Sequence, residues 1–188
     1  MANLSHLSEG EMKEILMLQE RLTLLDTQEK ARDSFLEYIH HIWPGFIEGD
    51  HHRIIADKLT RVAKGELKRL IVNMPPRHTK SEFASIYFPS WVMGLKPDMK
   101  IMQTTHTADL SINFGRKVRN LMDSDEYSKI FPKVSLAADS KSAGKWQTSQ
   151  GGEYFAAGVG GAIAGRGADL LIIDDPHSEQ DAMSINLL

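Results

Sequence analysis

The most informative segment of the sequence is residues 70–81, which run Leu70-Ile71-Val72-Asn73-Met74-Pro75-Pro76-Arg77-His78-Thr79-Lys80-Ser81. The first five residues are mostly apolar and predict a buried strand, which the two prolines close. A helix is expected from about Lys80 to Met93, and Gly94 and Pro97 end it. A Lys-Ser pair between a strand and a helix is typical of a phosphate-binding loop, in which the lysine meets phosphates and the hydroxyl meets Mg²⁺.

The loop departs from the usual phosphate-loop pattern because Met74 and Thr79 stand where that pattern has its two glycines. Taken alone, the segment therefore fits an ordinary polar helix start as well as it fits a phosphate loop. The Pro75-Pro76 pair offers rigidity by another route.

A second segment supports the phosphate-loop interpretation. Leu170-Leu171-Ile172-Ile173-Asp174-Asp175 is an apolar run that ends in two carboxylates. In phosphate-loop ATPases a buried strand delivers one acidic residue to Mg²⁺, and a following acidic residue orients the attacking water. Asp174 is the candidate for the first role and Asp175 for the second. The simpler alternative is a strand that ends in a solvated Asp-Asp-Pro turn.

The rest of the chain predicts an α/β fold. Apolar residues at helical spacing between Met12 and Leu25 indicate an N-terminal helix, and a second helix is expected over residues 29–42. Further helices are expected over residues 52–63, 80–93 and 108–122, and strands over residues 70–74, 100–105, 145–149, 154–157 and 170–173. This alternation indicates a mostly parallel sheet flanked by helices, with a helical segment before it.

Composition excludes several classes of protein. The 188 residues are 41% hydrophobic and 25% charged, which is ordinary for a globular protein of about one α/β domain. The absence of cysteine excludes disulfides and zinc sites with cysteine ligands. The apolar runs are too short for a membrane span, so no membrane association is expected. A formal net charge of -3 argues against a uniformly basic protein that coats DNA.

The region between the two motifs is rich in glycine. Residues 158–169 run Gly-Val-Gly-Gly-Ala-Ile-Ala-Gly-Arg-Gly-Ala-Asp, and such a run predicts a loop because glycine disfavours regular helix and strand. Arg166 lies between two of these glycines. It is either an arginine that neutralises phosphate charge in the transition state or a surface arginine in a loop.

Three signatures together resemble one family. They are Pro75-Pro76-Arg77-His78-Thr79-Lys80-Ser81-Glu82, then Trp146-Gln147-Thr148-Ser149-Gln150-Gly151-Gly152, then residues 158–176. In this order they are similar to the large terminase subunits of tailed bacteriophages, over roughly Gly49 to Asp181. The resemblance implies a P-loop NTPase of the additional-strand type, with an extra strand between the two nucleotide motifs. Thr104 or its neighbours would close the site from that strand.

The resemblance also implies roles for individual residues. ATP would be bound by residues of the phosphate loop, namely Pro76, Arg77, His78, Thr79, Lys80 and Ser81. Mg²⁺ would be held by Ser81 and Asp174. The catalytic residues would be Asp175, Arg166 and Arg77. Family members commonly have Glu where this chain has Asp175, so Glu179 is the alternative carboxylate. His51 and His52 lie where the family contacts adenine, although a solvated helix start is the simpler interpretation.

The same resemblance implies binding partners and a location in the host cell. Family members use ATP hydrolysis to drive double-stranded DNA through a portal protein into an empty capsid, together with a small terminase subunit. We expect self-association into a ring, in the host cytoplasm at the portal vertex of the procapsid. Residues 1–48 are expected to form a helical N-terminal segment and residues 49–188 an ATPase domain incomplete at its C-terminus. Because the family's nuclease domain is absent, nuclease activity is not expected.

Two other functions fit the same motifs. A helicase-like ATPase would share both nucleotide motifs, although Trp146-Gln147-Thr148-Ser149 and the glycine-rich run favour a terminase. A non-catalytic module that docks on portal or partner subunits would explain the substituted phosphate loop.

Overall fold

The computed structural model describes residues 8–139, 142–161, 163 and 165–178. Its elements, in chain order, are α1 (Glu9–Asp33), α2 (Phe35–Ile42), α3 (Asp50–Ala63), a π-helical segment η1 (Glu82–Tyr87), α4 (Phe88–Leu95), β1 (Lys100–Thr105), α5 (Ala108–Met122), α6 (Asp125–Ile130), β2 (Lys145–Gln147), β3 (Glu153–Gly158) and β4 (Leu170–Ile173).

The four strands form one sheet in the order β2-β3-β1-β4. The central strand β1 pairs in parallel with β3 on one side and with β4 on the other, while β2 pairs antiparallel with β3. The predicted α/β class and the mostly parallel sheet flanked by helices are therefore confirmed. β2 and β3 form a hairpin across Gly151-Gly152, and Gly151 has a positive φ (90°) that glycine adopts readily.

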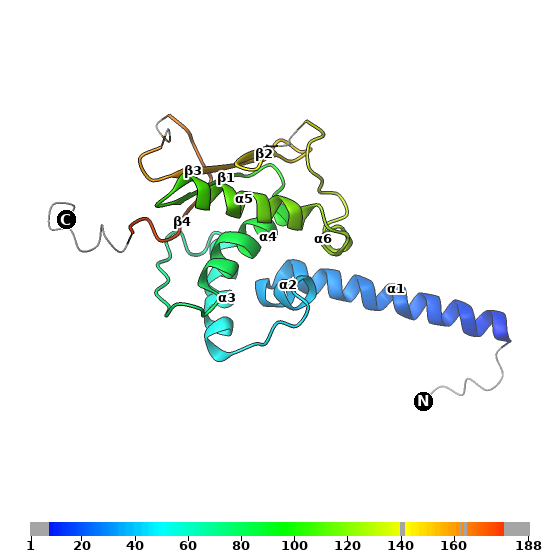
Figure 1. Ribbon diagram of the computed structural model, residues 1–188. Helices are drawn as coiled ribbons and strands as arrows, with labels where there is room; N and C mark the ends of the chain where they lie inside the picture. Colours follow the sequence, from blue (N-terminus) through cyan, green and yellow to red (C-terminus); the bar gives the residue numbers. More distant parts are fainter. Residues whose placement is uncertain (1–7, 140–141, 162, 164, 179–188) are drawn as a thin grey trace.

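The helices cover one face of the sheet. Figure 1 shows α3, α4 and α5 on its lower side, where Ile101, Tyr154 and Ile172 are buried in the core. No helix of the described residues covers the opposite face. Leu171 and Ile173 point to that face and are 54% and 58% exposed, although every residue of the strand is apolar. The alternation arises because successive side chains of a strand point to opposite faces.

Residues 70–74 do not form the predicted strand. This segment is irregular and takes no place in the four-stranded sheet, and Ile71 is 88% exposed. Leu70, Val72 and Met74 are partly buried against the core, so the segment lies along the body without pairing. A mostly apolar run such as residues 70–74 becomes a strand only where a neighbouring strand completes its hydrogen bonds, and among the described strands β4 is bonded only to β1.

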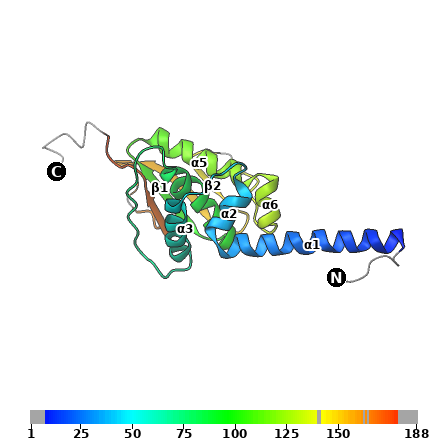
Figure 2. The ribbon, with the colours of Figure 1, turned by 90° about the horizontal axis from the view of Figure 1, so that it is seen from below.

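The N-terminal helices differ from the prediction in where they break. The break falls at Ser34, which has an extended backbone and whose hydroxyl accepts a hydrogen bond from the Glu37 amide at the start of α2. That cap ends α1 and begins α2. Figures 1 and 2 show α1 extending away from the rest of the molecule, while α2 packs into the core through Phe35, Tyr38 and Ile39.

The helix that follows the phosphate-loop candidate is not a uniform α-helix. The helix begins at Lys80, is π-helical over η1 and continues as α4. The π-helical segment buries Phe83, Ser85 and Ile86. Segments of this kind are rare and occur frequently at functional sites. The sequence predicted a helix over residues 80–93 but gave no sign of this change of winding.

Candidate functional site

The two sequence motifs meet in space at one cluster of charges. The Lys80 Nζ lies 2.5 Å from Asp175 Oδ1 and 3.3 Å from Asp174 Oδ1. The Asp174 side chain is buried, with 7% exposed, whereas the Asp175 side chain is 68% exposed. The ammonium thus bridges one buried and one solvent-facing carboxylate. Charge-assisted contacts of this kind are the strong class of hydrogen bond.

The sheet positions the two carboxylates. Asp174 and Asp175 directly follow β4, and the neighbouring strand β1 holds them through its own carboxyl end. The Asp174 amide donates to the Thr104 carbonyl at 2.9 Å, and the Asp175 carbonyl accepts from the His106 amide at 3.3 Å. Parallel strands bring their carboxyl ends to one edge, where α/β proteins bind ligands.

Ser85 completes the buried part of the site. Its hydroxyl is fully buried and donates to Asp174 Oδ2 at 2.8 Å. Asp174 therefore has Lys80 at one oxygen and Ser85 at the other. In the described part of the chain Ser85 is the serine bonded to Asp174, whereas Ser81 was predicted to share a Mg²⁺ ion with Asp174. Ser81 lies one residue before η1 and is half-buried.

The loop before Lys80 adopts an unusual backbone. Arg77 and Thr79 have φ angles of 64° and 62°, in the left-handed region that favours glycine. Asp175 has a φ of 43°. Side chains in this region cost roughly 1–2 kcal/mol per residue, and such residues cluster at functional sites. Thr79 thus takes the glycine-like conformation that the position before the lysine needs, without being glycine.

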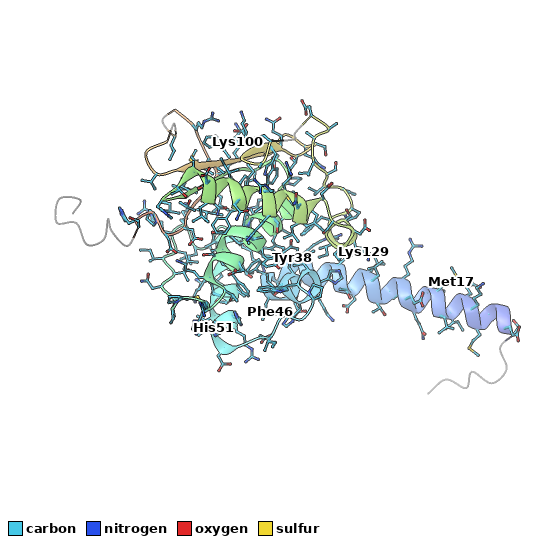
Figure 3. The ribbon with its side chains drawn as sticks, viewed as in Figure 1. Met17, Tyr38, Phe46, His51, Lys100 and Lys129 are labelled. Carbon is cyan, nitrogen blue, oxygen red and sulfur yellow. The ribbon has the colours of Figure 1, made fainter. Side chains whose placement is uncertain are left out.

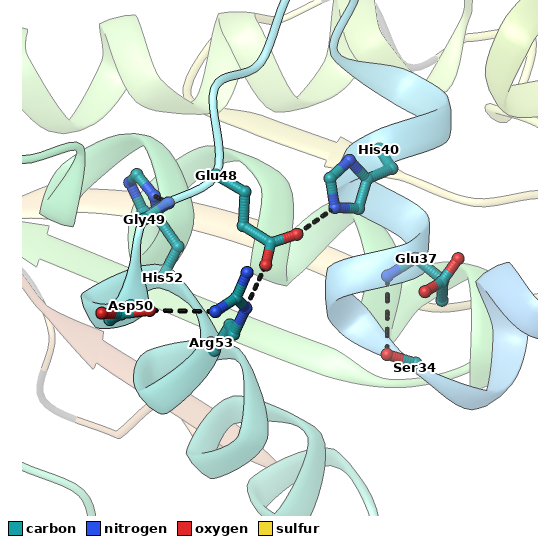
Figure 4. Close-up of polar contacts among 8 residues, drawn as sticks. All are labelled: Ser34, Glu37, His40, Glu48, Gly49, Asp50, His52 and Arg53. Atoms are coloured by element: carbon teal, nitrogen blue, oxygen red, sulfur yellow. Dashed lines mark hydrogen bonds and ion pairs between the residues drawn. The ribbon is translucent and has the colours of Figure 1, made fainter.

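A histidine from α3 fixes Thr79. The Glu48 carboxylate bonds to both His40 and Arg53 (Figure 4). These two contacts hold the chain in place at the start of α3. There the Gly49 amide donates to His52 Nδ1 at 2.9 Å. Because Nδ1 accepts, the neutral ring carries its proton on Nε2, which donates to the Thr79 hydroxyl at 2.7 Å.

The Thr79 hydroxyl links His52 to the backbone of the loop. It donates to the His78 carbonyl at 2.6 Å, while His78 Nδ1 donates to the Pro76 carbonyl at 2.9 Å. His52 is only 6% exposed, so the interpretation of His51-His52 as a solvated helix start is wrong for His52. The loop is therefore held by a buried histidine that sequence reasoning had assigned to solvent.

Two pKa shifts follow from this arrangement. Burial disfavours the charged form of Lys80, but the hydrogen bond to Asp175 and the charges of Asp174 and Asp175 outweigh it and raise the pKa of Lys80. Lys80 is therefore cationic at neutral pH. For His52, burial lowers the pKa, and the neighbouring His51 lowers it further. His52 therefore favours the neutral form that its two hydrogen bonds need.

Arg166 lies elsewhere. Its guanidinium carbon sits 3.9 Å above the centre of the Phe155 ring, and its Nη1 is 3.7 Å from Glu153 Oε1. Glu153 begins β3, at the opposite end of the parallel strands from Asp174. The structure thus brings Lys80, Asp174 and Asp175 together, but the Arg166 side chain packs against β3 instead. Arg77 and His78 are exposed on the loop, and Glu179 lies outside the described residues.

The donor set suits a magnesium ion that is also held by phosphate. Among the described residues no group of three or more His, Asp or Glu side chains is placed to hold a metal ion. Mg²⁺ in nucleotide sites usually takes one or two carboxylates, with phosphate and water oxygens completing its shell. The buried Asp174 beside a lysine that favours polyphosphate fits that pattern.

No protein-family model matches this chain, and no curated protein and no solved structure is significantly similar to it. None of the helices in the described residues combines the length and the apolarity needed to cross a bilayer.

Proposed function

We infer that the chain binds ATP with Mg²⁺ at the cluster of Lys80, Asp174 and Asp175 and hydrolyses it there, as part of a DNA-packaging motor of the large-terminase type. One observation carries this proposal. A lysine at a helix start and two aspartates at a strand end, 94 and 95 residues apart along the chain, form one ion-paired cluster. Two unrelated sequence motifs would usually lie apart in the folded protein.

The surroundings of the cluster support nucleotide binding. The loop before Lys80 turns through Arg77 and Thr79 in left-handed conformations, which direct successive backbone amides differently from an ordinary helix start. Backbone amides, a helix N-terminus and a lysine together favour bound phosphate. Lys80 is 23% exposed, so its ammonium is within reach of a ligand from solvent.

Each residue of the cluster has a distinct chemical role in the proposal. Lys80 would exchange its two carboxylates for phosphate oxygens and stabilise their charge. Asp174 would hold Mg²⁺, which neutralises charge on the phosphates, while Ser85 keeps the carboxylate in place. Asp175 is exposed and adjacent, so its carboxylate can orient the attacking water. The side chain of Arg166 has no part in this arrangement, because it is engaged on β3.

The DNA-packaging assignment rests on the resemblance of the motifs to terminases. The portal protein, the small terminase subunit, double-stranded DNA and a ring of copies belong to that part of the proposal, as does a place at the procapsid in the host cytoplasm. The adjacency of β1 and β4 supports the additional-strand type, since β1 lies between the two motifs in sequence and contacts the second through Thr104.

The direct test is calorimetric titration of ATP with Mg²⁺ into the chain and into Lys80→Ala. Losing a charge-assisted contact to phosphate costs about 1.5–3 kcal/mol, so affinity should fall roughly 10- to 100-fold. Lys129→Ala is the matched control, because Lys129 is an exposed lysine on α6, far from the cluster (Figure 3). It should bind like the parent.

The outcomes separate the candidate functions. Binding that is equal in the parent and Lys80→Ala, or absent from both, overturns the nucleotide site and favours the docking module. If the site binds, ATP turnover measured with and without double-stranded DNA follows. Stimulation by duplex DNA supports a packaging motor, whereas stimulation by single strands alone supports the helicase-like alternative.

A further inference from the structure

Helix α1 is attached to the body only near its C-terminal end. There the Ala31 carbonyl accepts from the Trp91 indole at 2.7 Å, and the Arg32 guanidinium donates to the Ile130 carbonyl at 2.6 and 2.9 Å. Ala31 is the buried residue of the helix. The 25 residues of α1 make a rod of about 37 Å, most of which projects into solvent in both views (Figures 1 and 2).

The projecting part exposes several large apolar side chains to solvent. Seven large hydrophobic side chains on it are between 36% and 65% exposed, namely Met12, Leu16, Met17, Leu18, Leu22, Leu24 and Leu25. A helix that is apolar on several sides is normally buried, and helices gain most of their stability from packing. The composition of α1 therefore calls for a partner along its length.

Three of these side chains and the half-buried Ile15 form one stripe. Ile15, Leu18, Leu22 and Leu25 are spaced by three, four and three residues, which is the a-d-a-d repeat of a coiled coil. We call these four residues the α1 seam. Charged residues end it on both sides, because Glu11 and Glu29 occupy the next positions of the repeat.

The α1 seam faces away from the body. At 100° per residue, Ala31 lies roughly 160° around the helix from the centre of the seam. Thr27 and Gln28, the other side chains of that end that are half-buried, also lie away from the seam. A second helix laid along residues 15–25 would therefore lie on the side of α1 opposite Ala31, and Arg32, the body contact nearest in direction to the seam, lies seven residues past Leu25.

The charges beside the seam select both the occupant and its direction. In a parallel pair of α1 helices, Arg21 at a g position lies opposite Asp26 at the following e position of the other copy, and symmetry makes this contact twice. Asp26 also pairs with Lys30 of its own helix at 2.7 Å, so the contact between copies would add a second cation to an exposed carboxylate. In an antiparallel pair with Ile15 opposite Leu25, Arg21 instead lies beside its own counterpart. The charge pattern thus complements a second copy of α1 in the parallel direction.

We propose that the α1 seam pairs two copies of this chain through a parallel two-stranded coiled coil. The pair has two-fold symmetry and closes at two copies, so it differs from the ring that a packaging motor requires. Because the seam lies on the side of α1 away from the body, both bodies stay clear of it at the same end of the coil. The proposal does not depend on the nucleotide site.

Sedimentation equilibrium of the full chain tests this pairing. Between about 1 and 100 µM, the parent should approach twice its mass of 21.1 kDa. Leu22→Glu places a charge in the seam and should leave a monomer over the whole range. Met17→Glu is the matched control, since Met17 is similarly exposed on the projecting part of α1 but lies off the seam (Figure 3). It should still pair.

The direction is tested by cross-linking. The sequence contains no cysteine, so Leu18→Cys introduces a single thiol. In a parallel pair the two copies of this residue face each other at a distance that suits a disulfide, and mild oxidation should give a covalent dimer. A paired chain that does not cross-link overturns the parallel direction. A parent that stays monomeric, or a Leu22→Glu variant that pairs as the parent does, overturns the proposal and leaves the seam to a helix of another protein.

Discussion

Removing the Ser85 hydroxyl tests whether the buried half of the site is built as described. Ser85 is fully buried, Asp174 is 6% exposed, and their oxygens are 2.8 Å apart. A hydrogen bond to a charged group contributes about 1.5–3 kcal/mol. Since Lys80 still contacts the other oxygen of Asp174, we expect Ser85→Ala to lower the free energy of unfolding by about 2 kcal/mol, and the melting temperature by roughly 4–8 °C.

Urea denaturation at pH 7 measures this loss, and a double-mutant cycle assigns it. In an Asp174→Asn background the acceptor is neutral, so Ser85→Ala should cost at least about 1 kcal/mol less than in the parent. Ser128→Ala is the control, because Ser128 is exposed and its hydroxyl bonds only to the backbone of its own helix turn. We expect a change within about 0.5 kcal/mol for it. The reasoning fails if Ser85→Ala behaves like Ser128→Ala, or costs the same in both backgrounds.

Two further predictions concern the loop before Lys80. Arg77→Gly removes the strain of a left-handed arginine, worth about 1–2 kcal/mol, but adds roughly 0.5–1 kcal/mol of backbone entropy to lose on folding. It should therefore stabilise the chain slightly in urea denaturation, and a clear loss of stability would show that the Arg77 side chain contributes more than its strain costs. Because the folded-state pKa of His52 lies below its unfolded value, the unfolded chain binds more protons just below pH 6.5. The free energy of unfolding should accordingly fall as pH drops through this window, and the fall should be smaller in His52→Gln; equal slopes in the two proteins would contradict the role given to His52.

Several elements were predictable because their signal is local. The strand over residues 100–105 and the helix over residues 108–122 have the bounds that the sequence predicted. The strand at residues 170–173 was also placed correctly, and its two following aspartates meet Lys80 as the paired motifs indicated. In each case the pattern or run of apolar residues within the segment carries the information.

The segment over residues 70–74 shows where local signal fails. Its composition predicts a strand, but strand formation needs a partner whose backbone completes the hydrogen bonds, and composition does not say whether that partner is present. The same holds for the exposed face of β4, where the apolar composition of the strand did not indicate that Leu171 and Ile173 face solvent. Burial depends on what covers the sheet, which is a property of the assembled fold.

The sequence by itself determined the α/β class, the order of most elements and the charged residues that meet at the carboxyl edge of the sheet. Only the tertiary structure decided which further side chains surround the charged residues at that edge. Three contacts show this. A π-helical turn brings Ser85 to Asp174, the buried His52 holds Thr79, and the Arg166 side chain packs against β3. They join separate parts of the chain or depend on a local change of helix winding. Periodicity indicates which side of an element is apolar. These contacts depend on how separate elements pack against one another, and that packing cannot be read from any single segment of the sequence.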